Sequence, residues 1–223
     1  MNLDLKIVLP IVIAFCISVV LCPIVIPFLK KLKFGQFVRD DGPQAHLKKA
    51  GTPTMGGLII LLSFTITTLL YMKKYPDVLP VLFVTLGFGL IGFIDDYIKV
   101  VMKRSMGLHA WQKMLGQIVV TGVFAYYIEK YSDINNELII PFVGRTVQLN
   151  SVLYVILLFF IVLGTVNGAN FTDGLDGLAS SVTVLIATFF VVVSVGIGSG
   201  VAPVTCAAVG SLLGFLVYNV YPA

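Results

Sequence analysis

The stretch Asn167-Gly-Ala-Asn170-Phe-Thr-Asp173-Gly-Leu-Asp176-Gly-Leu178 separates two apolar segments, residues 152–166 and 178–195. Both segments are long and apolar enough to lie in a bilayer, so the polar groups between them stand at a membrane edge. A carboxylate at the bilayer centre costs about 2.5–3.5 kcal/mol on insertion scales. Two carboxylates and two side-chain amides at such a junction therefore indicate a functional site.

The composition of the whole chain is that of a polytopic membrane protein. Its 223 residues are 58% hydrophobic and 12% charged, against about 45–50% and about 25% in soluble domains. No polar stretch is long enough for a separate soluble domain, so we expect one all-α transmembrane domain over residues 1–223. The net charge of +4 fits lysines and arginines beside a membrane, and nothing in the sequence points to nucleic acid.

Seven segments are suited to membrane-spanning helices, which need about 20 predominantly apolar residues. Helices are expected because backbone polar groups must be satisfied within the segment in lipid. We place them near residues 7–29, 55–72, 78–94, 113–131, 151–167, 178–196 and 200–219. Around Val143-Gly144 the residues are of β type, which predicts a small extracytoplasmic β-hairpin in the stretch 139–149.

The distribution of lysine and arginine predicts the orientation. With seven spans the loops 30–54 and 95–113 lie on the same side; they carry ten basic residues, and the other side carries five. Because basic residues are enriched in cytoplasmic loops, we expect the N-terminus outside and the C-terminus inside. The polar-rich segments 49–57, 95–96 and 167–177 then share the cytoplasmic face, where they could converge on one pocket.

Asp95 and Asp96 close the third apolar segment. Adjacent carboxylates at a dry edge repel each other and need a cation or a proton. Their hard oxygens suit Mg²⁺, which usually takes one or two protein carboxylates plus substrate phosphates. A solvated helix end, with Lys99 one turn on as an ion-pair partner, explains the pair equally well.

Asn167, Asn170, Asp173 and Asp176 recur every three residues. On an α-helix each such step turns back by about 60°, so the first three share a face and the fourth drifts away. Gly174 and the glycine that follows Asp176 are expected to break the helix and turn Asp176 back. The competing interpretation, Asp176 as the N-cap of the next helix, explains one residue but not four at a fixed interval.

Lysines and glycines elsewhere admit two interpretations. Lys49 precedes the Gly/Pro/Thr-rich run that ends at Gly57, which suits a phosphate-binding cation and equally a membrane-side anchor. Lys113, which opens an apolar segment, is better explained by itself as a snorkelling interface lysine. The pair Gly210-x-x-x-Gly214 is more typical of a close helix-packing surface than of a site.

Carboxylates for a metal, amides for a sugar or base, and lysines for phosphate thus share one predicted membrane face. The simplest chemistry is transfer of a phosphoryl-linked group from a soluble nucleotide donor to a lipid acceptor. The rival from another class is a non-catalytic membrane protein or small transporter. That rival would need charges along a path through the bilayer centre, and the acids here cluster at predicted span ends instead.

The chain resembles the phospho-N-acetylmuramoyl-pentapeptide transferase family. The motifs that carry the resemblance follow in chain order: Arg39-Asp-Asp-Gly-Pro43, Lys49-Ala-Gly-Thr-Pro-Thr-Met-Gly-Gly57, Gly92-Phe-Ile-Asp95-Asp96-Tyr-Ile-Lys99, Lys113 and residues 167–179. The paired acids and the motif Asp-Gly-Leu-Asp-Gly are similar to the wider superfamily of polyprenyl-phosphate N-acetylhexosamine-1-phosphate transferases. The run Gly-Thr-Pro-Thr-Met-Gly-Gly narrows the resemblance to the muramoyl branch, with a sister UDP-N-acetylglucosamine transferase as the nearest alternative.

The resemblance implies a bacterial plasma-membrane enzyme with its active face in the cytoplasm. Its donor would be UDP-N-acetylmuramoyl-pentapeptide, its acceptor undecaprenyl phosphate, its cofactor Mg²⁺ and its leaving group UMP; a homodimer is left open. The implied catalytic residues are Asp95, Asp96 and Asp173, of which Asp95 and Asp96 would also hold the metal. The implied substrate-binding residues are Lys49, Thr52, Lys113, Asn167, Asn170, Gly174 and Asp176.

The chain departs from the family pattern in its length. Family members have about ten spans and carry, beyond the position at which this chain stops, a third acid in a Met-Gly-Asp-type motif and a cytoplasmic histidine cluster. No Asp, Glu or His follows Asp176 in this sequence. The resemblance therefore implies weak or no turnover for the 223 residues by themselves.

Overall fold

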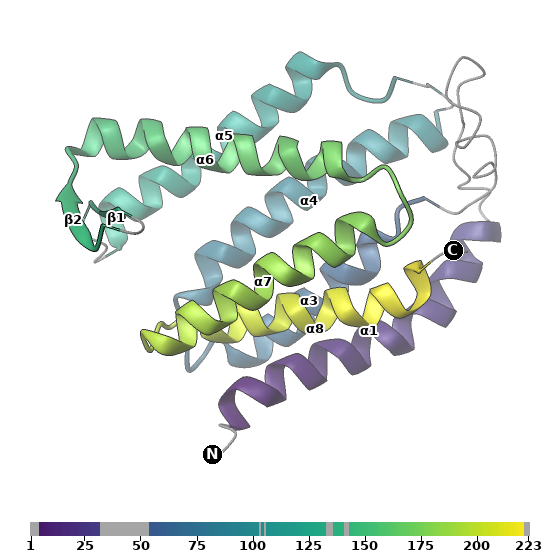
Figure 1. The fold of residues 1–223 in the computed structure, drawn as a ribbon. Coiled ribbons are helices and arrows are strands. Elements are labelled where there is room, and N and C mark those ends of the chain that lie inside the picture. Colours follow the sequence, from purple (N-terminus) through teal and green to yellow (C-terminus); the bar gives the residue numbers. More distant parts are fainter. Residues whose placement is uncertain are drawn as a thin grey trace. The chain divides into compact units, whose positions relative to one another are not determined.

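Helices occupy each of the seven predicted segments. The computed structural model describes residues 5–31, 54–102, 104, 106–132, 136–140 and 143–220. In these residues the elements are α1 (Leu5–Lys31), α3 (Gly57–Tyr71), α4 (Val78–Val100), α5 (Ala110–Tyr131), β1 (Glu137–Ile140), β2 (Arg145–Gln148), α6 (Ser151–Thr172), α7 (Leu178–Gly196) and α8 (Ala202–Asn219) (Figure 1). The prediction of an all-α membrane fold with one small hairpin is confirmed.

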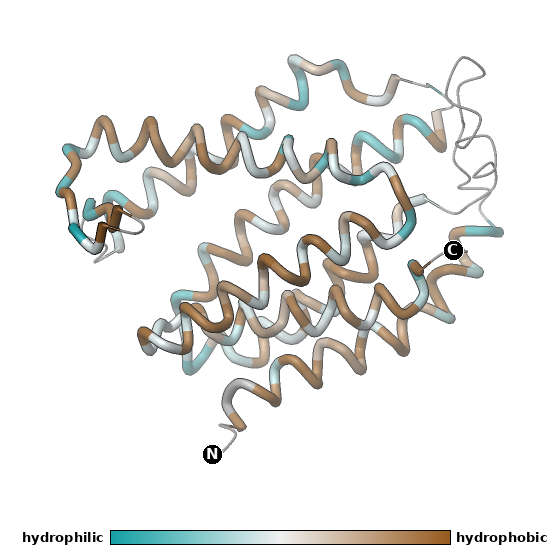
Figure 2. The backbone as a smooth tube through the Cα atoms, viewed as in Figure 1, coloured by the Kyte–Doolittle hydropathy of each residue, from teal (hydrophilic) through white to brown (hydrophobic). Residues whose placement is uncertain are grey.

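Five of the helices are long and apolar enough to cross a membrane, by length and composition. They are α1 from Val8 onwards, α4, α6, α7 and α8. Figure 2 shows hydrophobic residues along much of the length of these helices. The apolar helix α3 is shorter, with 15 residues. α5 is not among the five because Lys113, Gln117 and Glu129 interrupt its apolar sequence.

The predicted hairpin forms where β-type residues flank a turn. β1 and β2 pair antiparallel, with Glu137 opposite Gln148 and Ile140 opposite Arg145. Gly144 in the turn has a φ of +64°, a left-handed conformation that costs a residue with a Cβ about 1–2 kcal/mol. Gly144 therefore permits the tight reversal.

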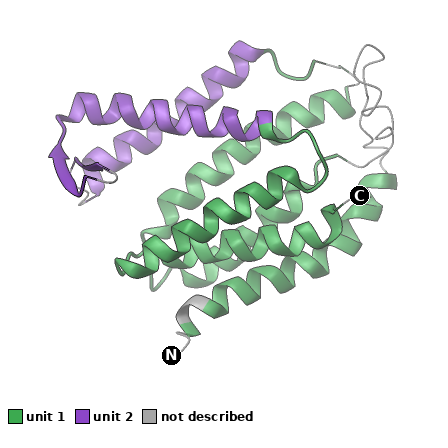
Figure 3. Ribbon diagram, in the orientation of Figure 1, with its two compact units in different colours: residues 1–109, 172–223 green, residues 110–171 purple. Residues whose placement is uncertain are grey.

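The described chain divides into two compact units (Figure 3). The first unit comprises residues 1–109 with 172–223, and the second comprises residues 110–171. The first unit thus contains α1, α3, α4, α7 and α8, and the second contains α5, the hairpin and α6. Whether residues 1–223 act as one domain stays a prediction.

The first unit is packed around α8, which contacts α1, α3 and α7 (Figure 1). α8 and α1 approach closely at Gly210 and Gly214. A Cβ added at Gly214 would meet the Ser18 Cβ at 2.6 Å and the Phe15 carbonyl oxygen at 2.7 Å. The Ser18 hydroxyl donates to the Ser211 carbonyl oxygen at 3.0 Å. The Gly-x-x-x-Gly pair is therefore a helix-packing surface, as the sequence predicted.

Candidate functional site

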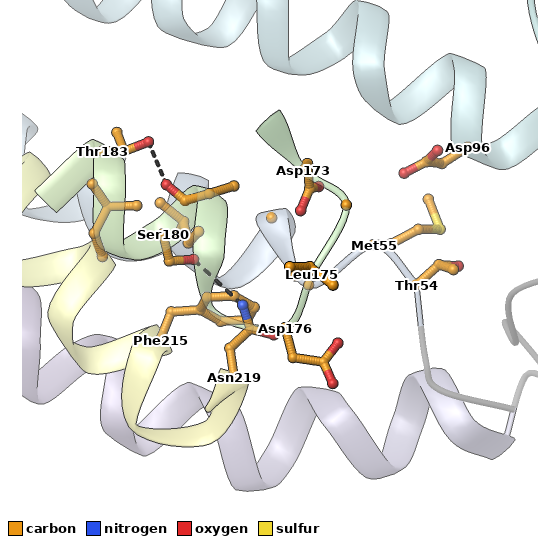
Figure 4. Close-up of a pocket in the computed structure, with 16 residues that line it drawn as sticks. Thr54, Met55, Asp96, Asp173, Leu175, Asp176, Ser180, Thr183, Phe215 and Asn219 are labelled. Carbon is orange, nitrogen blue, oxygen red and sulfur yellow. Dashed lines mark hydrogen bonds between the residues drawn. The ribbon is translucent and has the colours of Figure 1, made fainter. Parts of the chain in front are cut away.

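The first unit contains a cavity of about 530 Å³ (Figure 4). It is bordered by the start of α3, the later part of α4, the α6–α7 loop, the start of α7 and the end of α8. The lining residues are Thr54, Met55, Gly56, Gly57, Ile60, Asp96, Asp173, Gly174, Leu175, Asp176, Ala179, Ser180, Thr183, Leu212, Phe215 and Asn219. Parts of all three polar-rich segments therefore meet at one cavity, which confirms the predicted convergence.

A tight non-helical turn brings Asp173 and Asp176 to the cavity. α6 ends at Thr172 and α7 begins at Leu178. The Gly174 N–H donates to the Thr172 carbonyl oxygen at 2.9 Å, and Gly177 has a φ of +73°. The expected helix break at the two glycines is confirmed. Gly177 rather than Asp176 is the N-cap residue of α7, so the interpretation of Asp176 as that cap is wrong.

Asp95 and Asp96 have different surroundings. Asp95 is 3% exposed and is not among the residues that line the cavity. The Lys99 ammonium donates to Asp95 Oδ2 at 2.6 Å and lies 3.4 Å from Asp96 Oδ1, while the Leu108 N–H donates to Asp95 Oδ1 at 2.9 Å. The predicted ion pairing by Lys99 is confirmed, but the solvated helix end is wrong, because α4 continues to Val100 and Asp95 is buried. The half-exposed Asp96 is the member of the pair at the cavity.

Figure 4 shows the Asp96 side chain extending toward the loop that carries Asp173, with Thr54 and Met55 on the neighbouring stretch. The backbone of Met55 has a φ of +70°, which is unusual for a residue with a Cβ. Its carbonyl oxygen accepts the Leu58 N–H at 3.1 Å, and this bond starts the turn into α3. The first turn of α3 thereby becomes part of the cavity wall, where a helix N-terminus favours anions.

Several predicted substrate-binding residues lie elsewhere. Lys49 and Thr52 lie outside the described residues. Lys113, Asn167 and Asn170 belong to the second unit; Lys113 is in the first turn of α5, and Asn170 is exposed near the end of α6. Their contacts with substrate stay predictions.

Asn167 has a structural partner that the sequence did not indicate. Its amide donates to Gln117 Oε1 at 2.9 Å and to the Leu163 carbonyl oxygen at 2.8 Å, and the Gln117 amide donates back at 3.5 Å. Gln117 is 6% exposed, so this reciprocal amide pair satisfies polar groups between α5 and α6. Spacing along α6 gives no information about a partner on α5, and the pair was therefore missed.

The oxygen donors at the cavity fit a magnesium ion that is completed by substrate. Among the described residues no three His, Cys, Asp or Glu side chains group closely enough to hold a metal by themselves. Asp96 and Asp173 come from different elements and line the same cavity. One or two carboxylates plus phosphate oxygens and water is the usual protein environment of Mg²⁺.

Six lining residues lie outside the motifs identified from the sequence: Ile60, Ser180, Thr183, Leu212, Phe215 and Asn219. Ser180 opens α7, and Phe215 and Asn219 lie near the end of α8. The Asn219 amide donates to the Ser180 hydroxyl at 3.4 Å, as Figure 4 shows. The polar Asn219 at the end of an apolar helix was the one available signal for this wall.

Comparisons with known proteins identify the relatives of this chain. The model of glycosyl transferase family 4 matches residues 78–223, and phospho-N-acetylmuramoyl-pentapeptide-transferase signature 1 matches residues 49–61. The chain is 48% identical to the phospho-N-acetylmuramoyl-pentapeptide-transferase of Caldicellulosiruptor bescii, covering 99% of this chain and 68% of that protein. It is 46% identical to the protein of the same name from Clostridium kluyveri, over 98% of this chain and 69% of the relative. It is 45% identical to the phospho-N-acetylmuramoyl-pentapeptide-transferase of Bacillus subtilis, over 99% of this chain and 69% of the relative.

Proposed function

The chain belongs to the phospho-N-acetylmuramoyl-pentapeptide-transferase family, and from this premise we propose its reaction and the roles of its residues. The reaction transfers phospho-N-acetylmuramoyl-pentapeptide from its UDP-linked donor to undecaprenyl phosphate. It releases UMP and forms a lipid-linked intermediate of peptidoglycan synthesis. One observation supports the assignment of this reaction to the cavity: Asp96, Asp173 and Asp176 line it together with the first turn of α3.

The bond changes define what the site must supply. An oxygen of the lipid phosphate attacks the sugar-linked phosphorus of the donor, and the bond from that phosphorus to UMP breaks with its electron pair remaining on UMP. A phosphate monoester carries a charge of about −1.5 to −2 at pH 7, so the attacking oxygen needs little help from a base. The principal requirement is neutralisation of negative charge between the two phosphate groups.

Asp96 and Asp173 are the residues that we assign to this requirement. Their carboxylates would repel phosphate unless a cation lay between them, and their oxygens suit Mg²⁺. When bound, the magnesium ion would stabilise the charge that develops on the phosphate oxygens. The two carboxylates would hold the ion at the phosphate groups, Asp96 from α4 and Asp173 from the α6–α7 loop.

The remaining cavity residues are assigned to the nucleotide. Gly174 and Asp176 flank Leu175 in the turn, where Asp176 can accept the N–H of a uracil ring and Gly174 allows the ring to approach the backbone. Phe215 offers an aromatic face on the opposite helix α8. The lysines Lys49 and Lys113 are proposed to meet the diphosphate, as the family resemblance implies.

The same proposal includes the position in the cell. Ten basic residues in the loops 30–54 and 95–113, against five in the others, support a cytoplasmic cavity in a bacterial plasma membrane. A homodimer is part of the proposal on the ground of resemblance alone, and light scattering of the purified protein in detergent tests it.

The decisive assay measures Mg²⁺-dependent transfer from the UDP-linked donor to undecaprenyl phosphate. Removing an electrostatic stabiliser of a transition state typically lowers kcat about 10²–10³-fold, and this is the expected result for Asp96→Asn and Asp173→Asn. Asp77→Asn is the matched control, because Asp77 is exposed at the start of α4 and is not a lining residue. Wild-type rates in both cavity variants would refute the site.

The same assay separates the rival functions. Preference for UDP-N-acetylglucosamine as donor would favour the sister transferase. Absence of both transfer and Mg²⁺-dependent UMP binding would favour a non-catalytic protein. Measuring the 223-residue chain beside a relative such as the Bacillus subtilis protein tests the expectation of weak turnover, which stays a prediction.

A further inference from the structure

Asp95 and Asp96 are neighbours in α4, yet only Asp96 reaches the cavity. The Asp95 side chain is 5% exposed, whereas the Asp96 side chain is 40% exposed and lines the cavity. Successive residues of a helix point about 100° apart, so one carboxylate faces the cavity and the other faces the segment that follows α4. The two acids therefore have separate environments and can have separate tasks.

Asp95 joins α4 to the segment that follows it. Its Oδ1 accepts the Leu108 N–H at 2.9 Å, and its Oδ2 accepts the Lys99 ammonium at 2.6 Å. Gly107 has a φ of +58°, and a Cβ on it would meet Asp95 Oδ1 at 2.5 Å and Lys99 Cε at 2.8 Å. Only glycine fits this conformation in this space. We call the group of Asp95, Lys99, Gly107 and Leu108 the latch.

Lys99 connects the latch to the cavity. Its ammonium lies 3.4 Å from Asp96 Oδ1 while it bonds to Asp95. A free lysine side chain samples many rotamers, so a charge-assisted bond to a buried carboxylate is needed to keep the ammonium in one place. Held there, the ammonium constrains the orientation of the Asp96 carboxylate.

We propose that Asp95 is a positioning residue: its carboxylate holds Lys99 and the segment 107–108 so that Asp96 keeps its place at the cavity. The proposal rests on the proposed function, because Asp96 is the group that would meet metal or phosphate. It divides the roles of the two acids. Asp96 contacts the reacting groups, and Asp95 acts through Lys99.

A double-mutant cycle on kcat tests whether Asp95 acts through Lys99. Losing a hydrogen bond to a charged group costs about 1.5–3 kcal/mol, so Asp95→Asn and Lys99→Gln should each lower kcat by roughly 10–100-fold with little change in KM for the donor. The double variant should lose no more than Lys99→Gln alone, to within about twofold. If the kcat loss of the double variant equals the product of the two single losses, the proposal is overturned, because Asp95 would then act independently of Lys99.

Gly107 offers a second route to the latch that leaves every carboxylate in place. Gly107→Ala should reproduce the kcat loss of Asp95→Asn. The matched control is Gly198→Ala, since Gly198 has a similar φ of +66° with nothing within 4 Å of an added Cβ. If both variants lose the same amount of kcat, backbone strain alone explains the loss, and the proposal is overturned.

Hydrogen exchange at the Leu108 amide tests the latch without any activity. Asp95→Ala should accelerate exchange at this amide by about tenfold or more, since its acceptor is removed, and Asp96→Ala should leave it unchanged. Unaltered exchange in Asp95→Ala would overturn the latch. If the unmodified protein shows neither transfer nor Mg²⁺-dependent UMP binding, the proposed function fails, and this measurement still decides whether the latch exists.

Discussion

Glycine serves opposite purposes in two regions of the first unit. Along the α1–α8 contact, Gly210 and Gly214 remove side chains so that two backbones can meet, and an added Cβ would clash with α1. At the cavity, Gly57 and Gly174 line open space, and an added Cβ would meet nothing within 4 Å. Glycine thus closes a gap between helices in one region, whereas Gly57 and Gly174 leave space in the cavity, next to a Gly56 that packs against the Phe215 ring.

The largest expected effect on stability is at the closed region. Gly210→Val would place its Cβ against the Ile11 carbonyl oxygen and 2.9 Å from the Ala14 methyl. Overpacking typically costs 1–3 kcal/mol. Because the added side chain would clash with a backbone carbonyl, we expect the free energy of unfolding to fall by about 3 kcal/mol. Thermal unfolding in detergent measures the loss. Gly196→Val, at a helical glycine with open space, should change stability little, and equal losses in the two variants would contradict the distinction.

A smaller effect, on binding rather than on stability, is expected at the cavity. Gly57→Ala adds a methyl group to the cavity wall at the first residue of α3. One extra methylene in a pocket changes binding by about 1–3 kcal/mol, so KM for the UDP-linked donor should rise at least about tenfold. The temperature of thermal unfolding should be unchanged or slightly higher, because alanine stabilises a helix more than glycine does. An unchanged KM would show that the wall at Gly57 does not meet the donor, and Gly196→Ala serves as control.

The smallest effect separates two serines. The Ser18 hydroxyl is fully buried and donates to Ser211 across the α1–α8 contact at 3.0 Å. Ser18→Ala should lower stability by about 1 kcal/mol, the usual net value of such a bond. Ser180→Ala removes only a 3.4 Å contact with Asn219 at the cavity and should cost less. A larger loss of stability for Ser180→Ala than for Ser18→Ala in denaturation experiments would contradict the view that the α1–α8 contact, rather than the cavity, stabilises the fold.

Local sequence patterns were sufficient to predict the helices, the hairpin and the glycine turn before α7, because each of these elements depends on residues that are near in sequence. The meeting of Thr54–Gly57, Asp96 and Asp173–Asp176 followed from topology, since alternate loops of a membrane bundle share a face. The Gly-x-x-x-Gly pair of α8 was also interpreted correctly, because its spacing has one common use.

What the sequence could not resolve depends on contacts between distant elements. The burial of Asp95 depends on the Leu108 N–H, thirteen residues later in the chain. Asn167 shares its spacing with Asp173, yet its amide faces Gln117 on α5. Phe215 and Asn219 reach the cavity only because α8 packs beside α7. In each case the deciding partner is a packed neighbour rather than a sequence neighbour.

The central claim is that the uridine nucleotide binds in the cavity of the first unit, and photolabelling with a 5-azido uridine nucleotide tests it most directly. With Mg²⁺ present, the label should attach to peptides that contain residues 173–183 or 212–219, and excess UMP should suppress it. The same label should be weaker in Asp173→Asn and unchanged in Asp77→Asn. Labelling confined to other peptides, or labelling of these peptides that UMP does not suppress, would contradict the claim.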